Sequence, residues 1–239
     1  MQQIHRRFQQ SREWLAGLRA LRKAGKASTT TLWIGDSHAR FNLGKGTFGG
    51  RISAASPSDF VWSIGPRLAF SIAKNGWPPD VVLGSKLLTR CEIPQLTAFV
   101  LGEIDIRMFL STQIAENMIE LAWLPHYLGR CADLSQEQGR LGVIVVPIPP
   151  SARTEEQMLP EIGSIRDRVE AHRVIREAFT REVAHEFKSK LTVFDATDLL
   201  CTLNGDLHDS YTDDGWHLNS AGAAIFQHQW AEFLRSVWS

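Results

Sequence analysis

Short apolar stretches recur along the chain, and segments with helical spacing separate most of them. The five stretches are rich in β-branched and aromatic residues, as strands are, and they lie at 30–34, 60–64, 97–101, 141–147 and 191–195. Strands that alternate with helices predict a largely parallel sheet covered by helices on both faces. We therefore expect one large α/β domain with a mainly parallel sheet of five strands.

Three further segments are predicted to be helices from the spacing of their apolar residues. The longest is 165–187, with Ser164 as a candidate N-cap, and the last one begins near Asn219. The third is 112–124, which we expect to be interrupted or ended near Pro125, because proline lacks a backbone N–H and clashes with the preceding turn.

The charge of the chain is balanced overall but uneven along its length. Lys plus Arg and Asp plus Glu both number 26, so nothing in the net charge points to a nucleic-acid partner. Residues 1–26 nevertheless hold seven basic residues against one acidic residue. We predict a basic N-terminal helix over 1–27, packed on a domain that spans 28–239; contact with a membrane surface or an acidic partner is the alternative.

No apolar run reaches the roughly 18 residues that a membrane-spanning helix needs, and no signal-peptide core follows the first residues. We therefore expect a cytoplasmic protein without a membrane span. Cys91, Cys131 and Cys201 are odd in number and lack the spacing of a metal site, so free thiols are expected rather than disulfides or bound zinc.

Four loops that follow predicted strands carry the residues with chemical potential. These loops are 35–38 (Gly-Asp-Ser-His), the turn at 65–66, the segment 102–107, and 214–217 (Asp-Gly-Trp-His). In open parallel sheets, ligands bind outside the carboxyl ends of the strands. We therefore expect all four loops to meet at one edge of the sheet.

A serine and a histidine in these loops suit nucleophilic catalysis. Ser37 would be the nucleophile, and because a serine hydroxyl is unreactive by itself, a base must take its proton. His217 is the candidate base, since imidazole titrates near neutrality. Asp214 would orient His217, although Asp213, one residue away, remains an alternative.

The first and last of these loops resemble the corresponding motifs of the SGNH (GDSL-like) hydrolases. The resemblance implies a flavodoxin-like three-layer α/β/α sandwich, with Ser37, Asp214 and His217 as a catalytic triad. It further implies that Gly65 and the Ser37 amide bind the oxyanion, without a metal or cofactor. The reaction class implied is hydrolysis of a small-molecule or glycan acyl ester, or transfer of the acyl group to a sugar hydroxyl.

The third block departs from the family pattern. Where the family has Gly-x-Asn-Asp, residues 102–105 are Gly-Glu-Ile-Asp, so Ile104 stands at the asparagine position and cannot donate a hydrogen bond. Loss of one oxyanion donor typically lowers turnover by about 10² to 10³. The block is similar to a variant associated with glycan or polysaccharide modification, which makes Arg107 a candidate for binding the oxyanion or an acidic substrate group. Asp36 in the first block and Asp105 in the third are further candidates for oxyanion or substrate binding. Arg107 is equally suited to an ion pair with a neighbouring carboxylate.

Two other functions remain open. The chain could be a non-catalytic binding module in which Ile104 marks lost chemistry. It could also be a dinuclear metallophosphoesterase, because Asp36-x-His38 matches the opening motif of those enzymes. The further metal ligands would then come from Asp105, His208, Asp213 and His217.

For His38 itself, the simplest expectation is a turn residue that caps the next helix. The acyl group and the oligomeric state cannot be predicted from the sequence.

Overall fold

The computed structural model describes residues 31–44, 52–54, 59–89, 95–137, 139–153 and 163–239. The expected N-terminal helix over 1–27 and Cys91 lie outside these residues. The described part of the chain forms one sheet of six strands in the order β2-β3-β1-β4-β5-β6. The strands are β1 (Thr31–Gly35), β2 (Ile52–Ala54), β3 (Asp59–Ser63), β4 (Leu96–Val100), β5 (Leu141–Val145) and β6 (Leu191–Phe194).

Five strands of the sheet are parallel, and they coincide closely with the five predicted stretches. Their order, β3-β1-β4-β5-β6, is that of flavodoxin-like folds, in which the second strand lies on one side of the first and all later strands lie on the other side. The expected α/β/α sandwich is confirmed. The edge strand β2 was not predicted; it is only three residues long and pairs antiparallel with β3.

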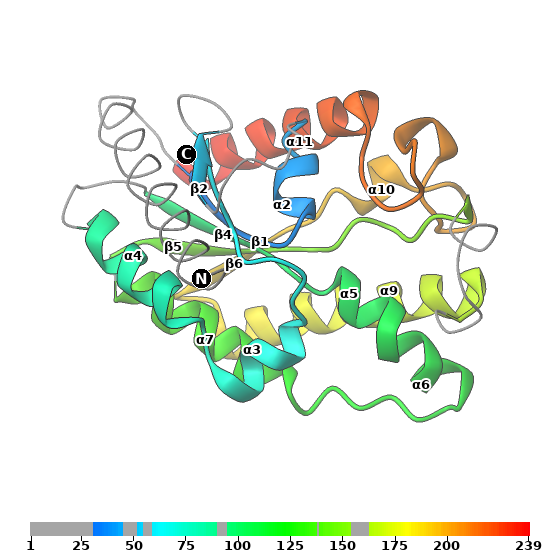
Figure 1. The fold of residues 1–239 in the computed structure, drawn as a ribbon, viewed down its shortest axis with the longest axis horizontal. Coiled ribbons are helices and arrows are strands. Elements are labelled where there is room, and N and C mark those ends of the chain that lie inside the picture. The colour runs from blue at the N-terminus through cyan, green and yellow to red at the C-terminus, as the bar shows by residue number, and fades with distance from the viewer. Residues whose placement is uncertain (1–30, 45–51, 55–58, 90–94, 138, 154–162) are drawn as a thin grey trace, which may run out of the picture.

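Helices cover both faces of the sheet (Figure 1). One face carries α2 (His38–Phe41), α10 (Thr197–Leu200) and α11 (Ser220–Trp238). The other carries α3 (Ala69–Asn75), α4 (Pro79–Thr89), α7 (Leu124–Gln136) and α9 (Ile165–Glu182). Alternate side chains of β1 serve the two resulting cores, since Leu32 and Ile34 belong to the core under α3 and α7 while Trp33 belongs to the core under α11.

The described residues also form several shorter helical segments. They are α5 (Glu103–Asp105), the π-helical turn η1 (Ile106–Leu110), α6 (Ser111–Ala115), the π-helical turn η3 (Val183–Phe187) and the 3₁₀ turn η4 (Asp209–Tyr211).

Two of the three helix predictions are confirmed. Helix α9 with η3 fills the predicted range 165–187, and the Ser164 hydroxyl accepts a hydrogen bond from the Asp167 amide at 3.1 Å. Helix α11 begins after Asn219, whose side-chain oxygen accepts from the amides of Ala221 and Gly222. Both helices therefore start where a side chain replaces the missing backbone acceptors.

The prediction of a helix over 112–124 is wrong. Helix α6 ends at Ala115, and the next helix, α7, begins at Leu124. Pro125 lies in the first turn of α7, where its missing N–H would have no partner within the helix in any case. The proline therefore marks the beginning of a helix, not the end of one.

The strand register brings the first three loops together. Gly35 at the end of β1 is paired with Ser63 on one side and with Val100 on the other. Ser37, Gly65 and Gly102 each follow this row by two residues. The strands β1 and β4 lie close together at Gly35, because a Cβ atom on this residue would lie 2.4 Å from the Val100 carbonyl oxygen. A glycine is needed at position 35 for β1 and β4 to approach so closely.

No helix within the described residues is both long enough and apolar enough to cross a bilayer. Cys131 and Cys201, which are described, are both free thiols, and Cys131 is fully buried.

Candidate active site

Ser37 and His217, 180 residues apart in the chain, are joined by a hydrogen bond. The Ser37 Oγ lies 2.8 Å from His217 Nε2. Ser37 follows β1 and precedes α2, whereas His217 lies in the loop that precedes α11. The distance is within hydrogen-bond reach, so the imidazole is placed to accept the hydroxyl proton.

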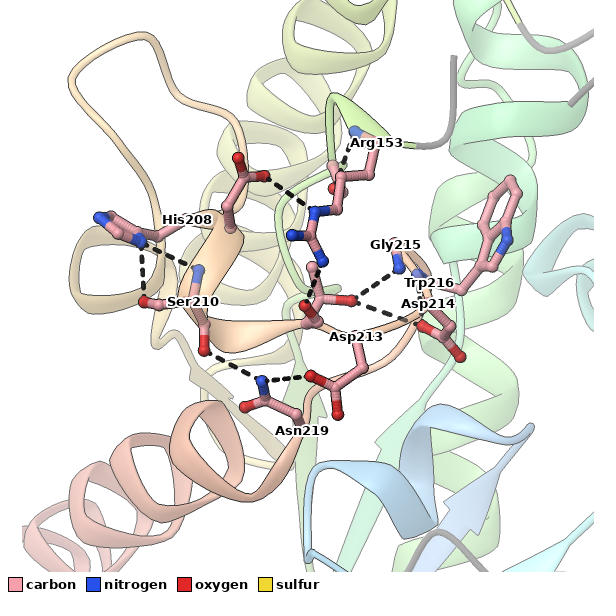
Figure 2. A network of polar contacts seen from close by, with 11 residues as sticks. Arg153, His208, Ser210, Asp213, Asp214, Gly215, Trp216 and Asn219 are labelled. Atoms are coloured by element: carbon pink, nitrogen blue, oxygen red, sulfur yellow. Dashed lines mark hydrogen bonds and ion pairs between the residues drawn. The ribbon is translucent and has the colours of Figure 1, made fainter. Parts of the chain in front are cut away.

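Asp214 holds the other side of the His217 ring. Its Oδ2 lies 2.7 Å from His217 Nδ1, and its Oδ1 accepts from the amides of Trp216 and His217, each at 2.8 Å. Asp213, the alternative, instead accepts from the Asn219 side chain at 3.1 Å (Figure 2). The geometry therefore pairs Asp214, not Asp213, with the imidazole.

A network of polar contacts fixes the loop that carries Asp214 and His217 (Figure 2). Arg153 Nη1 donates to the Thr212 carbonyl oxygen at 3.1 Å, and the Thr212 hydroxyl accepts from the Gly215 amide at 2.9 Å. Asn219 donates to the Ser210 carbonyl oxygen at 3.0 Å. The loop is thus tied both to the segment after β5 and to the first turn of α11.

The surroundings of His217 favour the neutral form of its imidazole, which is the form that a base requires. Burial lowers the pKa of His217, the neighbouring His38 lowers it further, and Asp214 only partly offsets both effects. Partial burial acts to raise the pKa of Asp214, but the hydrogen bonds from His217 and Trp216 outweigh it and hold that pKa below its usual value. The Phe41 ring stacks on the imidazole at 3.9 Å between centroids.

His38 is more than the turn residue that we expected. It is 5% exposed, its Nε2 lies 3.3 Å from Glu103 Oε2, and its ring centroid lies 4.9 Å from that of His217. Burial acts to lower the pKa of His38, but Asp36 and Glu103 outweigh it and raise that pKa. A cation beside His217 is therefore favoured at mildly acidic pH.

Glu103 also holds Arg107, one helical turn further along the same block. The Arg107 Nε lies 3.0 Å from Glu103 Oε1, and its guanidinium carbon lies 4.5 Å from the centroid of the Trp216 ring. The ion pair expected for Arg107 is present, with Glu103 as the partner. Together, Glu103 and Arg107 connect the block after β4 to the loops of Ser37 and of His217.

Asp36 and Asp105 are placed differently from expectation. They are 1% and 0% exposed, so neither presents a carboxylate to a substrate. Asp36 Oδ1 accepts from the His38 amide at 2.9 Å, and Asp105 accepts from the amides of Ala69 and Phe70 at 2.7 and 2.9 Å. Burial raises the pKa of each carboxyl to about 6. Both aspartates therefore accept backbone amides next to the site, Asp36 at the beginning of α2 and Asp105 at the beginning of α3.

The turn at Gly65 lies beside Ser37 at the edge of the sheet. Its φ of 76° lies in the left-handed region that favours glycine, and a Cβ there would meet no atom within 4 Å. The space beside it is therefore open. Ile104, at the position of the family's asparagine, is partly buried and offers no side-chain donor.

The ligand set of the metallophosphoesterase alternative is not assembled. Within the described residues, no three His, Cys, Asp or Glu side chains converge as metal ligands would. Of the expected ligands, Asp213 bonds Asn219, and His208 Nδ1 lies 2.8 Å from the Ser210 hydroxyl. Asp105 is occupied by backbone amides.

Sequence reasoning missed three contributors to the site, namely Phe41, Thr212 and the double contact of Glu103. The spacing of four residues between Glu103 and Arg107 was a usable signal, because such pairs are neighbours on a helix. Nothing local marked Phe41 or Thr212, since their contacts depend on the conformation of the loop before α11.

The fold described above is similar to that of several solved GDSL-like and SGNH hydrolase structures. A GDSL-like lipase of Bacteroides thetaiotaomicron has a TM-score of 0.52 at 14% identity, over 94% of this chain and 99% of its own. A candidate SGNH hydrolase of Slackia heliotrinireducens has a TM-score of 0.51 at 15% identity, over 86% of this chain and 98% of its own. A candidate platelet activating factor of Streptococcus pneumoniae has 0.52 at 16%, over 97% of both chains.

Sequence comparison adds no closer relative. No profile of a known protein family matches the chain, and no curated protein matches it in sequence. At these levels of identity, the structural similarity establishes the fold, and the function has to be argued from the site itself.

Because the pKa of His217 is lowered, any activity that needs its neutral form should persist below pH 6.5. The acidic limb of the profile of kcat/KM against pH reports this group. In the variant His38→Gln, the cation that lowers the pKa of His217 is absent, so the limb should move to higher pH. The matched control is His208→Gln, an exposed histidine in the same loop region, which should leave the limb in place. If the acidic limb did not move in His38→Gln, it would not report a His217 whose pKa is lowered by His38.

Proposed function

We propose that the protein is a serine ester hydrolase of SGNH type, in which Ser37, His217 and Asp214 form the catalytic triad. The observation that carries the proposal is the chain of hydrogen bonds from the Ser37 hydroxyl through the His217 ring to the Asp214 carboxylate. The order nucleophile, base and orienting carboxylate is the arrangement that activates serine on unrelated folds. The shared fold with GDSL-like hydrolases supports it further.

In the proposed reaction, Ser37 Oγ attacks the ester carbonyl carbon as His217 Nε2 takes its proton. The tetrahedral intermediate then collapses, and the imidazolium returns the proton to the leaving alcohol, which leaves an acyl group on Ser37. Water attacks this acyl-enzyme with His217 again as the base, releases the acid and restores the serine. A sugar hydroxyl in place of water would make the same chemistry an acyl transfer.

The proposed oxyanion site consists of the amides of Ser37 and Gly65. The two residues follow neighbouring strands in register, and the space beside Gly65 is open. Ile104 leaves this site without the side-chain donor of the family pattern. We therefore expect slower turnover than in a three-donor site, by about 10² to 10³. The substrate proposed is an acyl ester of a small molecule or glycan.

A fluorophosphonate probe tests the proposal directly, because it reacts with an activated serine. Intact-mass analysis of the folded protein should show one adduct per chain. The adduct should be absent from Ser37→Ala and His217→Ala, and unaffected by EDTA. The control is Ser210→Ala, which removes a serine that is hydrogen-bonded to His208 and should leave labelling intact.

The alternative is a non-catalytic binding module, and Ile104 is the specific observation that favours it. The probe experiment separates the two functions. A folded wild-type protein that remains unlabelled would support the binding module, and labelling suppressed by EDTA would support a metal-dependent enzyme.

A further inference from the structure

A narrow cleft lies beside the proposed triad, between the block after β4, the segment after β5 and the loop before α11. It is lined by Glu103, Arg107, Pro149, Pro150, Arg168 and Trp216. The lining therefore contains one carboxylate and two arginines, together with Trp216, which precedes His217 in the chain. The mechanism proposed above uses none of these side chains.

Arg107 is fixed in this cleft by contacts on two sides. Its Nε donates to Glu103 at 3.1 Å, and its guanidinium lies over the Trp216 ring at 4.5 Å. Within the described residues its two Nη groups donate no hydrogen bond, and a quarter of the side chain is exposed. A guanidinium held through Nε and stacked on an aromatic ring presents its outer nitrogens as a fixed fork, the geometry that suits a carboxylate or phosphate.

The position of Trp216 indicates which part of a substrate would meet this fork. Figure 2 shows the indole on the side of the loop away from Asn219, and the next residue is His217. In the proposed reaction His217 returns its proton to the leaving alcohol. The cleft beside it therefore adjoins the alcohol part of the ester, not the oxyanion, which the amides of Ser37 and Gly65 would bind.

We propose that Arg107 is a specificity-determining residue that binds an anionic group, a carboxylate or a phosphate, on the alcohol part of the ester. The inference rests on the proposed function for its substrate, but the binding site itself rests on the contacts of Arg107 alone. Glu103 orients Arg107 through Nε, and Trp216 provides the flat surface on which the guanidinium lies.

Three aryl acetates of similar shape test the proposal: 4-acetoxybenzoate, 4-acetoxyphenyl phosphate and the neutral 4-acetoxybenzamide. Each kcat/KM is divided by the rate of hydrolysis by hydroxide, which corrects for the leaving group. The wild type should prefer at least one anionic ester by about tenfold or more, the value of one charge-assisted hydrogen bond. The two anionic esters distinguish a carboxylate from a phosphate as the preferred group.

In Arg107→Gln the ratio of corrected kcat/KM between the anionic and the neutral ester should fall close to one, chiefly because KM for the anionic ester rises. Arg107→Lys should retain part of the preference. The control is Arg235→Gln, which removes the same charge from an exposed, paired arginine on α11 and should leave the preference unchanged. A wild type without preference, or an equal loss on all three esters in Arg107→Gln, would overturn the proposal; the second result would indicate an oxyanion role.

Binding of the products separates failure of this inference from failure of the proposed function. Calorimetry with 4-hydroxybenzoate, 4-hydroxyphenyl phosphate and 4-hydroxybenzamide requires no turnover. Tighter binding of an anionic product, lost in Arg107→Gln, would support the anion site even if the wild type hydrolysed no ester. Hydrolysis of the neutral ester together with equal binding of all three products would retain the hydrolase and reject the anion site.

Discussion

Replacing Asp214 with asparagine should lower kcat for an aryl ester by about 10⁴-fold, the loss that a tautomer reversal produces in a serine triad. The asparagine oxygen would keep the amides of Trp216 and His217, because they donate to Oδ1. The NH₂ group would then face His217 Nδ1 and donate to it. The ring proton would move to Nε2, which could no longer accept the proton of Ser37. Stopped-flow or steady-state kinetics of the variant would measure the loss.

The neighbouring Asp213 supplies the matched control for this prediction. Asp213→Asn changes the same charge one residue away, in a side chain that accepts from Asn219 and not from the imidazole. It should leave kcat within about twofold, because the site is exposed, the asparagine oxygen can still accept from Asn219, and the side chain does not contact the imidazole. Equal losses in the two variants would mean that the loop is merely disturbed, and a larger loss in Asp213→Asn would reverse the assignment of the orienting carboxylate.

The choice between Asp213 and Asp214 shows where sequence reasoning reached its limit. Both residues stand at plausible distances before His217, and the spacing alone does not separate them. In the structure the Thr212 hydroxyl and the amides of Trp216 and His217 all donate to Asp214 Oδ1, and the other oxygen of Asp214 faces the ring. Thr212 is in turn held by Arg153, which is 59 residues away in the chain, so a local pattern could not reveal this arrangement.

The fold was more predictable than the site because its signals are local. A parallel strand buried on both faces is a continuous apolar run, and the five parallel strands were recognised in this way. The edge strand β2 carries no such run in its three residues. The prediction of a helix over 112–124 was wrong because a proline is an ambiguous signal. The same residue type is compatible with the end of one helix and with the first turn of the next, and Pro125 lies in the first turn of α7.

The block after β4 could be recognised in the sequence, but its contacts could not. It was expected to supply oxyanion or substrate-binding groups. In the structure Glu103 contacts His38 of the first loop, Asp105 accepts from the amides that follow the second loop, and Arg107 lies over Trp216 of the last loop. Glu103 and Arg107 of this short block therefore contact the first and the last loop, and Asp105 contacts the beginning of the helix that follows the second loop.

Asp105 makes the most deeply buried of these connections. Its two carboxylate oxygens each accept a backbone N–H at the beginning of α3, directly after the turn that carries Gly65. The first amides of a helix have no partner within the helix, so the carboxylate here satisfies two such donors, of which that of Ala69 is buried. We therefore expect the position of the proposed oxyanion amide of Gly65 to depend on Asp105, although Asp105 itself is buried.

Asp105→Asn should destabilise the protein by about 1 to 3 kcal/mol, the cost of leaving one buried amide without an acceptor. Its side chain offers one oxygen for two N–H donors, and its NH₂ group would face the other amide. Because the Gly65 turn precedes these amides, we also expect kcat to fall by about 10 to 100-fold, as small displacements of catalytic groups do. Urea unfolding and steady-state kinetics measure the two effects.

Asp195→Asn is the control, because Asp195 also accepts a backbone amide, that of Thr197, at the beginning of a helix after the edge strand β6, and in addition pairs with Arg176. It should lower stability without lowering kcat. If Asp105→Asn behaved in the same way, Asp105 would only stabilise the fold, and the Gly65 turn would be positioned by the sheet register alone. A loss of kcat in Asp105→Asn that exceeds that of Asp195→Asn at equal stability would instead make Asp105 a positioning residue of the site.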